Sequence, residues 1–221
     1  MSNSIVLARK TFQVQSANLL PSSNGMAMCL LLLDRSGSMD QHGDTPRLAV
    51  NELIETLRIA PGAEQTLFAL ITFAGDVTLD TPPVRADQAQ LLMSYTAQGN
   101  TALYQAAYNA LMIGLEFRGF AQTRFSADAR IAISLISDGA DTASRNKVGE
   151  VRKLSETARG YGFALQAIGL GIDAQKLALD LGFEPGLAHD APATSDGLRG
   201  SMDSSIGTFI GTMTGQERPR R

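Results

Sequence analysis

Three short segments carry oxygen-bearing side chains at spacings that suggest a shared chemical task. The segment DRSGSM at residues 34–39 follows four leucines and places hydroxyls two and four positions after an aspartate. The segment GNT at residues 99–101 ends in a threonine, and SDG at residues 137–139 centres on a second aspartate. The candidate ligands are two carboxylates and three hydroxyls: Asp34, Ser36, Ser38, Thr101 and Asp138.

This set of side chains suits a hard divalent cation. Carboxylate and hydroxyl oxygens are ligands that Mg²⁺ and Mn²⁺ prefer, with Ca²⁺ as a further candidate. A zinc site usually draws on imidazole or thiolate, but His42, His189 and Cys29 all lie outside the three segments. Because hydroxyls coordinate a cation without neutralising it, a metal held here would stay electrophilic and would accept a further carboxylate from outside the chain.

Neighbouring residues are expected to shape the site and its rim. Gly37 is expected to permit the tight backbone path after Asp34, and Asp141 is expected to hydrogen-bond within its own turn rather than join the outer ligands. Behind the ligands we place Gly37, Gly99 and Asp141, and on the partner-facing rim Arg35, Met39, Asn100 and Gly139. A solvated surface position for Arg35 and a packing position for Met39 stay open as alternatives.

The rest of the sequence predicts the elements that position these segments. Continuous apolar runs predict buried strands, and apolar residues at three-to-four spacing predict helices. Strands are expected over residues 26–34, 66–75, 129–137 and 163–171, and helices over residues 45–60, 85–98, 102–117, 146–162, 173–182 and 195–213. Gly75-Asp76 predicts a hairpin into an antiparallel edge strand over residues 77–81, which Pro82-Pro83 closes.

Alternating strands and helices are typical of an α/β domain with a doubly wound, mostly parallel sheet and helices on both faces. In such sheets ligands bind at the carboxyl ends of the strands, where the strand order reverses. We therefore expect Asp34 and Asp138 to follow neighbouring strands, with Thr101 reaching the same crevice from the N-terminus of a helix.

The motifs DRSGSM, GNTALY and ISDGAD, in this order, resemble the metal-ion-dependent adhesion site of von Willebrand factor A domains. The resemblance implies a Rossmann-like fold in which the five candidate ligands hold a divalent cation. It also implies that an acidic side chain of a partner protein completes the site, so that the domain binds protein and is not an enzyme. We expect one domain over residues 1–221, with an N-terminal edge strand at about 4–15, a core at about 25–214 and a basic tail at 215–221.

In its length and general character the chain also resembles stand-alone bacterial A domains of tellurite-resistance-type stress systems. That likeness implies an intracellular complex with an AAA+ ATPase, a kinase or a phosphatase. A single cysteine and the lack of a signal peptide favour the cytoplasm. A net charge of -3 and the absence of an apolar run of about 20 residues predict no nucleic-acid partner and no membrane partner.

An alternative is a Mg²⁺-dependent phosphatase or phosphotransferase with Asp34 as nucleophile, as in the haloacid dehalogenase group. That chemistry usually needs an acid two residues later and a lysine on an intermediate loop. Position 36 is a serine, and residues 67–130 contain no lysine. The sequence also lacks the glycine-rich phosphate loop of P-loop nucleotidases.

Overall fold

A computed structural model of the chain describes residues 3–7, 10–14, 25–144 and 147–215. Its main sheet has six strands: β3 (Met26–Asp34), β4 (Thr66–Phe73), β5 (Val77–Arg85), β6 (Ala129–Ser137), β7 (Ala164–Leu170) and β8 (Ala188–Ala191). The α-helices in this part of the chain are α1 (Thr45–Ile59), α2 (Leu103–Phe125), α3 (Val148–Gly160), α4 (Ala174–Leu181) and α5 (Ser195–Thr214). None of these helices has both the length and the apolarity needed to cross a membrane.

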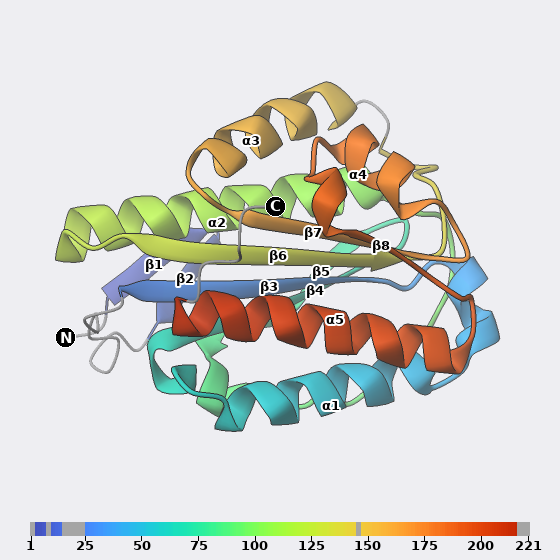
Figure 1. Cartoon of the computed structure of the whole chain (residues 1–221), viewed down its shortest axis with the longest axis horizontal. Coiled ribbons are helices and arrows are strands. Elements are labelled where there is room, and N and C mark those ends of the chain that lie inside the picture. Colours follow the sequence, from blue (N-terminus) through green and yellow to red (C-terminus); the bar gives the residue numbers. More distant parts are fainter. Residues whose placement is uncertain (1–2, 8–9, 15–24, 145–146, 216–221) are drawn as a thin grey trace.

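The sheet has the strand order β5-β4-β3-β6-β7-β8. All neighbouring strands are parallel except β5, which runs antiparallel to β4 at one edge. The predicted fold class, a doubly wound and mostly parallel sheet with one antiparallel edge strand, is confirmed. Helices α1 and α5 cover one face, and helices α2, α3 and α4 cover the other (Figure 1).

Strand β3 shows why the apolar run at residues 26–34 forms a central strand. All nine residues of β3 are buried. Met28, Leu30 and Leu32 belong to the core on the side of α2, whereas Leu31 and Leu33 belong to the core on the side of α1 and α5. Successive side chains of a strand point to opposite faces, so a strand covered on both sides must be apolar at nearly every position.

The point at which the strand order reverses lies between β3 and β6. These two strands are parallel neighbours, with Leu33 opposite Ile136 in the register. From β3 the chain continues to β4 on one side, and from β6 it continues to β7 on the other. The carboxyl ends of β3 and β6 therefore flank a crevice of the kind in which ligands bind, and both predicted carboxylate loops start there.

Residues 85–98 do not form the predicted helix, so that prediction is wrong. Residues 86–88 form a single 3-10 turn, η4 (Ala86–Gln88), and residues 89–98 have no regular secondary structure. The buried residues Ala86, Ala89 and Leu92 recur every third position. Ala89 has the extended dihedral angles φ -58° and ψ 132°. An extended chain with three residues per turn places every third side chain on the same side, which is close to the period of about 3.6 residues in an α-helix.

Other boundaries also differ from the predicted ones. Strand β5 runs through Pro82 and Pro83 to Arg85, because proline is tolerated on an edge strand whose outer side has no neighbour. The edge strand β8 (Ala188–Ala191) was not predicted, since it has only four residues and includes His189 and Asp190.

The N-terminal edge strand predicted over residues 4–15 does not join the main sheet. Strands β1 (Asn3–Leu7) and β2 (Lys10–Val14) pair with each other in a separate two-stranded antiparallel sheet. Leu7 lies opposite Lys10 in the register of this pair. Residues 216–221 of the predicted basic tail lie outside the described residues.

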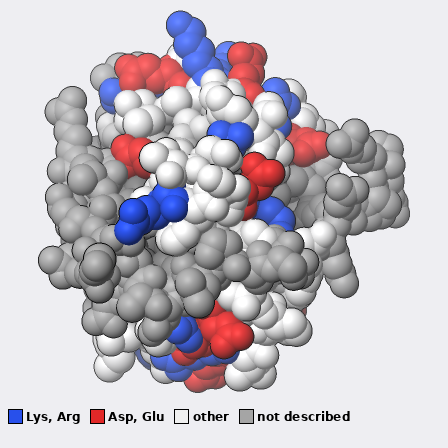
Figure 2. Space-filling model, turned by 90° about the vertical axis from the view of Figure 1, so that its left-hand side faces the viewer, with Lys and Arg blue, Asp and Glu red and all other residues white. Residues whose placement is uncertain are grey.

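The end of the molecule at which the parallel strands begin carries charges of both signs. Figure 2 shows that the described Lys and Arg side chains on this face are interspersed with Asp and Glu. Neither sign gathers into a broad field on the described part of this face, in keeping with the small net charge of -3.

Candidate metal centre

Asp34 is the last residue of β3, and its side chain is held in a fixed position. The residue is fully buried, with 0 % of its surface exposed. One carboxylate oxygen accepts a hydrogen bond from the Ser36 backbone N–H at 2.7 Å, and the other accepts one from the Ser137 hydroxyl. The Tyr95 hydroxyl donates to the Asp34 main-chain oxygen at 2.6 Å. Asp34 is thus tied both to its own loop and to the end of β6.

Two hydroxyls connect the loop after β3 with the loop after β6. The hydroxyl oxygens of Ser36 and Ser38 lie 3.2 Å apart, and Ser38 donates to Asp138 Oδ1 at 2.7 Å. The Gln41 amide reaches Asp138 Oδ2 at 3.4 Å. The structure therefore brings Asp34, Ser36, Ser38 and Asp138 together, although about 100 residues separate the two loops.

Thr101 lies just before α2 and is fixed by the turn that follows Asp138. Its N–H donates to the Thr142 hydroxyl at 2.9 Å, and its carbonyl accepts the N–H groups of Thr142 and Ala143. A methyl group built onto Gly139 would lie 3.8 Å from Ser38 Oγ and 3.9 Å from Thr101 Oγ1. The Thr101 hydroxyl therefore borders the same space beside Gly139 as the hydroxyl of Ser38.

Asp141 and the two glycines hold these loops against one another. Asp141 accepts hydrogen bonds from the N–H of Ser144 in its own turn and from the N–H of Tyr104 in the first turn of α2. Gly37 donates its N–H to the Gly99 carbonyl at 3.0 Å. Gly99 has φ +77°, which an L side chain rarely adopts.

Gly37 is not required by a left-handed backbone conformation, so the prediction that it permits the tight path after Asp34 is wrong. Its φ does not fall in the left-handed region, which is occupied by other glycines such as Gly99. An added Cβ at Gly37 would lie 3.5 Å from the Gly99 carbonyl oxygen, an ordinary contact distance. Gly37 matters here through its backbone hydrogen bond, which joins the first and second loops.

The donor set fits a hard divalent cation. Among the described residues there is no group of three or more His, Cys, Asp or Glu side chains that could hold a metal, so an ion at this crevice would depend on the hydroxyls. Burial raises the pKa of Asp34 to about 6, the nearby charge of Asp138 adds to the rise, and the hydrogen bonds from Ser137 and Ser36 oppose it. A cation between the two carboxylates would offset both the burial and the repulsion.

Of the four residues predicted for the rim, Arg35, Asn100 and Gly139 lie at least partly at the surface beside the candidate ligands, whereas Met39 does not. Asn100 is exposed and Gly139 is half-buried. Met39 is 0 % exposed and packs in the core beneath the loop with residues of α1 and α5. The prediction that Met39 contacts a partner is therefore wrong, because η2 (Gly37–His42) turns this side chain inward.

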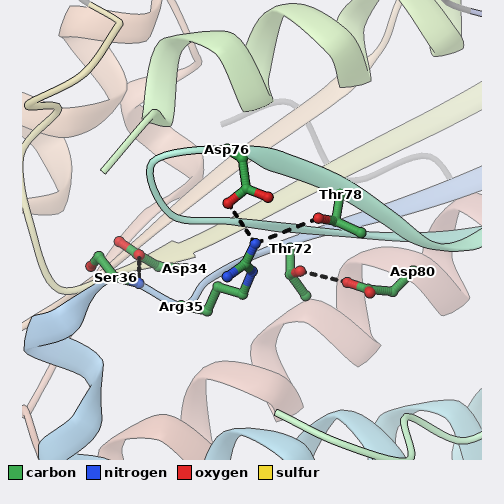
Figure 3. A network of polar contacts seen from close by, with 7 residues as sticks. All are labelled: Asp34, Arg35, Ser36, Thr72, Asp76, Thr78 and Asp80. Carbon is green, nitrogen blue, oxygen red and sulfur yellow. Dashed lines mark hydrogen bonds and ion pairs between the residues drawn. The ribbon is translucent and has the colours of Figure 1, made fainter. Parts of the chain in front are cut away.

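Arg35 points away from the candidate ligands and toward the β4–β5 hairpin (Figure 3). Its Nη2 forms an ion pair with Asp76 at 2.7 Å and donates to the Thr78 hydroxyl at 3.5 Å. The Arg35 side chain is 16 % exposed and that of Asp76 is 73 % exposed. Arg35 therefore forms part of a half-buried rim beside the candidate metal site.

Four residues with a part in the site were not singled out from the sequence. Ser137 and Gln41 contact the two aspartates, Tyr95 contacts the Asp34 main chain, and Thr142 fixes Thr101. Ser137 directly precedes Asp138, and this position was the one feature of the sequence that could have indicated its contact with Asp34. Tyr95 lies in the segment that was predicted to be helical, which hid its contact with the Asp34 main chain. No local sequence pattern around Gln41 or Thr142 indicates a part in the site.

Comparison with known proteins identifies related domains. The family profile of the von Willebrand factor type A domain matches residues 30–192. Comparison with curated proteins gives no match.

Solved structures with a similar fold include the pilus adhesin SpaC of Lactobacillus rhamnosus GG, with a TM-score of 0.63 and 13 % identity over 84 % of this chain and 30 % of that one. A von Willebrand factor type A protein from Catenulispora acidiphila has a TM-score of 0.58 and 19 % identity, over 85 % and 43 %. Proximal thread matrix protein 1 of the mussel byssus, with a zinc-occupied MIDAS motif, has a TM-score of 0.59 and 17 % identity, over 86 % and 47 %. The chain spans less than half the length of each of these proteins.

Proposed function

The chain belongs to the von Willebrand factor type A domain family, and on that premise we propose that it is a metal-dependent, non-enzymatic module that binds a partner protein. Asp34, Ser36, Ser38, Thr101 and Asp138 would hold Mg²⁺, with Mn²⁺ or Ca²⁺ as alternatives. The cation supplies a Lewis-acidic position for an acidic side chain of the partner. Arg35, Asn100 and Gly139 form the rim that faces the partner.

One contact carries this proposal. Ser38 donates to Asp138 Oδ1 at 2.7 Å, and this hydrogen bond joins the loops that follow the two strands on either side of the strand-order reversal. Because β3 and β6 are parallel neighbours, the sheet brings the two loops to the same end, and this contact shows that their oxygens meet there. Since oxygens alone meet at this contact, a hard cation is the ligand that the donor set favours.

The surroundings of Asp34 favour binding over phosphoryl transfer. A nucleophilic carboxylate needs an oxygen that can approach a phosphorus atom. Asp34 is fully buried, and each of its oxygens already accepts a hydrogen bond, from the Ser36 N–H and from the Ser137 hydroxyl. We propose on this ground that the domain does not form an aspartyl intermediate. Mg²⁺-dependent hydrolysis of a phosphate ester that is lost in Asp34→Asn would contradict this.

For the cellular setting we propose a location and a class of partner rather than one named protein. We place the domain in a bacterial cytoplasmic complex, in which an AAA+ ATPase, a kinase or a phosphatase of a stress system of the tellurite-resistance type supplies the acidic residue. The chemistry of the candidate metal is the basis for expecting a protein partner, because a Lewis-acidic hard cation accepts the carboxylate of an acidic side chain. Co-purification from a host extract with Mg²⁺, repeated with a chelator, would identify such a partner.

Direct metal titration tests the core of the proposal. Isothermal titration with MgCl₂ and MnCl₂ should give one ion per chain. Thr101→Val and Ser38→Ala should each weaken binding about tenfold or more, since losses of this order follow even the removal of supporting groups at metal sites. Thr157→Val, an exposed position on α3, is the matched control and should bind as the unmodified chain does. Equal binding by all four proteins would overturn the assignment.

A further inference from the structure

Beside the candidate metal site lies a groove that the five ligands do not use. The groove has a volume of about 340 Å³ and is lined by Arg35, Ala74, Gly75, Asp76, Gln98 and Gly99. An added Cβ at Gly75 or Gly99 would meet no atom within 4 Å, so the space above both glycines is open. The groove is thus bounded by the loop that follows β3 at residues 34–39, here called the metal loop, by the β4–β5 hairpin and by the segment that leads to Thr101.

Arg35 offers unused donors to this groove. A guanidinium carries five N–H groups, and the hydrogen bonds of Arg35 to Asp76 and Thr78 both start from Nη2. Nε and Nη1 have no acceptor among the described residues. Within that same part of the chain, the single side-chain nitrogen or oxygen that is both unpartnered and sealed from solvent is His42 Nε2. The free nitrogens of Arg35 are therefore not sealed from solvent, although the side chain as a whole is only 16 % exposed.

The ion pair with Asp76 is not needed to hold the metal loop in place. The backbone already does so: the Arg35 N–H donates to the Phe73 carbonyl at 2.7 Å, and the Gln98 N–H donates to the Arg35 carbonyl at 2.8 Å. Asp76 lies on an exposed hairpin, where an ion pair contributes little to stability. What the pair does is fix the guanidinium against the hairpin, in the position drawn in Figure 3.

We propose that this groove binds a second carboxylate of the same partner, so that the domain recognises a pair of acidic side chains rather than one. The inference rests on the proposed function, since the first carboxylate is the one that completes the metal site. Arg35 stands between Asp34 and Ser36 in the chain, and Gly99 stands two residues before Thr101, so both walls of the groove adjoin ligand-bearing residues. The unused N–H donors of Arg35 select the occupant, because a carboxylate accepts hydrogen bonds from a guanidinium and would share the Arg35 side chain with Asp76.

The spacing of the two acids follows from chain geometry. An extended peptide advances about 3.3 Å per residue, so acids two or three positions apart are separated by about 7–10 Å. The Arg35 side chain extends away from the candidate ligands toward the hairpin, so the two carboxylates of the partner must also be spaced apart (Figure 3). Two acidic residues separated by one or two others are therefore the expected motif.

Capped synthetic peptides that carry one glutamate, or two glutamates at offsets of one to four residues in a Gly-Ser background, provide the probe. Binding in the presence of Mg²⁺ is followed by NMR, through the backbone amides of residues 99–101 and the Arg35 Nε–H signal. The unmodified chain should bind the two-acid peptide of best offset about fivefold more tightly than the one-acid peptide, as expected for a partly exposed charge pair. The Arg35 Nε–H signal should shift with the two-acid peptide alone.

Two variants separate the outcomes. Arg35→Met should bind both kinds of peptide equally and keep its affinity for Mg²⁺, whereas Asp76→Asn should keep or increase the preference for two acids because a competing carboxylate is removed. Equal binding of both peptides by the unmodified chain, or an undiminished preference in Arg35→Met, would overturn the second site and leave the proposed function standing. If no peptide binds in a Mg²⁺-dependent way, the proposed function and the second site fall together.

Discussion

At the scale of single residues, Asp34 is where burial and charge conflict most directly. Its pKa is raised to about 6, chiefly by burial, and it has neither exposed surface nor an ion-pair partner among the described residues. The folded-state pKa lies above that of an unfolded aspartate, so the metal-free fold carries a penalty above pH 6. The penalty disappears as the pH falls from about 6 toward 4.

Asp34→Asn should therefore stabilise the metal-free protein. An amide can accept from the Ser36 N–H and donate to the Ser137 oxygen, while the Ser137 hydroxyl turns to the Gly139 carbonyl, which lies 3.1 Å from it. The gain in unfolding free energy should be about 3 kcal/mol at pH 7.5 and about half of that near pH 5. Urea denaturation with a chelator present measures both values. Asp203→Asn, at an exposed position of α5, is the control, and a gain in Asp34→Asn that does not change with pH would contradict the explanation.

The affinity for a metal ion should fall as the pH falls, although the metal-free fold becomes more stable. Below the pKa of about 6 a proton occupies Asp34 and must leave before a cation binds. The apparent dissociation constant for Mn²⁺ should therefore rise about tenfold for each pH unit below 6 and level off above it. Electron paramagnetic resonance of free Mn²⁺ at pH 5, 6 and 7 gives the slope. Constant affinity across this range would show that Asp34 does not titrate against the metal.

At the scale of elements, the segment 89–98 is fixed by side chains of α1 rather than by a backbone ladder. The Asn51 amide accepts from the Leu92 N–H at 2.7 Å and donates to the Leu92 carbonyl at 3.1 Å. Farther along, Tyr95 and Gln98 bond to the main chain of Asp34 and Arg35. The segment thus connects α1 with the metal loop and delivers the chain to Thr101.

Asn51→Ala should loosen this segment from α1. The change leaves the N–H and the carbonyl of Leu92 without partners, at a cost of about 1–3 kcal/mol of unfolding free energy. Hydrogen exchange followed by mass spectrometry should show faster exchange in residues 89–98, with little change in β6. As a control, Asn109→Ala removes one side-chain hydrogen bond, from Gln105 on α2, and should leave residues 89–98 protected. Unchanged protection in Asn51→Ala would show that apolar packing alone holds the segment.

Helix α5 contacts the sheet through a buried polar network. The Ser134 hydroxyl lies 3.0 Å from Gln166 Oε1 and 2.7 Å from Ser205 Oγ, and the Gln166 amide donates to Ser204 at 2.8 Å. Ser134, Gln166 and Ser205 are all 0 % exposed. Such a network is favourable when every member is satisfied, and it specifies one register of the helix on the sheet.

Gln166→Leu should lower the unfolding free energy by about 1–3 kcal/mol. The change removes the hydrogen bonds of the Gln166 amide to Ser134 and to Ser204. The double variant with Ser134→Ala should lose less than the sum of the single losses, since both residues belong to one network. Urea denaturation of the four proteins gives the coupling energy. Strictly additive losses would mean that the two side chains act independently.

At the scale of the whole molecule, the candidate site lies at the carboxyl ends of the central strands β3 and β6, outside both hydrophobic cores. Removal of the metal should therefore leave the secondary structure intact while lowering stability. At a Mg²⁺ concentration of about 100 times the dissociation constant, the unfolding free energy should exceed that with chelator by about 2.7 kcal/mol. Circular dichroism melting curves with and without Mg²⁺ measure this, and Asp138→Ala should abolish the difference. A melt that Mg²⁺ does not shift, in a chain that titration shows to bind it, would contradict this linkage.

Much of the fold follows from the sequence because its signals are local. A strand covered on both faces needs an almost continuous apolar run. Residues 26–33 supply one, and residues 129–137 supply one that is interrupted by Arg130 and Ser134. The hairpin at Gly75-Asp76 predicts an antiparallel edge strand, which β5 confirms. The candidate ligands were likewise visible before the structure, because the types and spacing of Asp34, Ser36 and Ser38 are chemical information within one loop.

Tertiary contacts decided the rest. Residues 85–98 have an apolar period close to that of a helix, but contacts with α1, including the Asn51 amide and the Arg58 guanidinium, hold them extended. The inward turn of Met39 and the pairing of Arg35 with Asp76 also depend on parts of the chain that are distant in sequence. The sequence by itself determined which atoms are available for chemistry. The packing of elements across the sheet decided which of those atoms meet, because the energies of burial and hydrogen bonding depend on neighbours that no local pattern specifies.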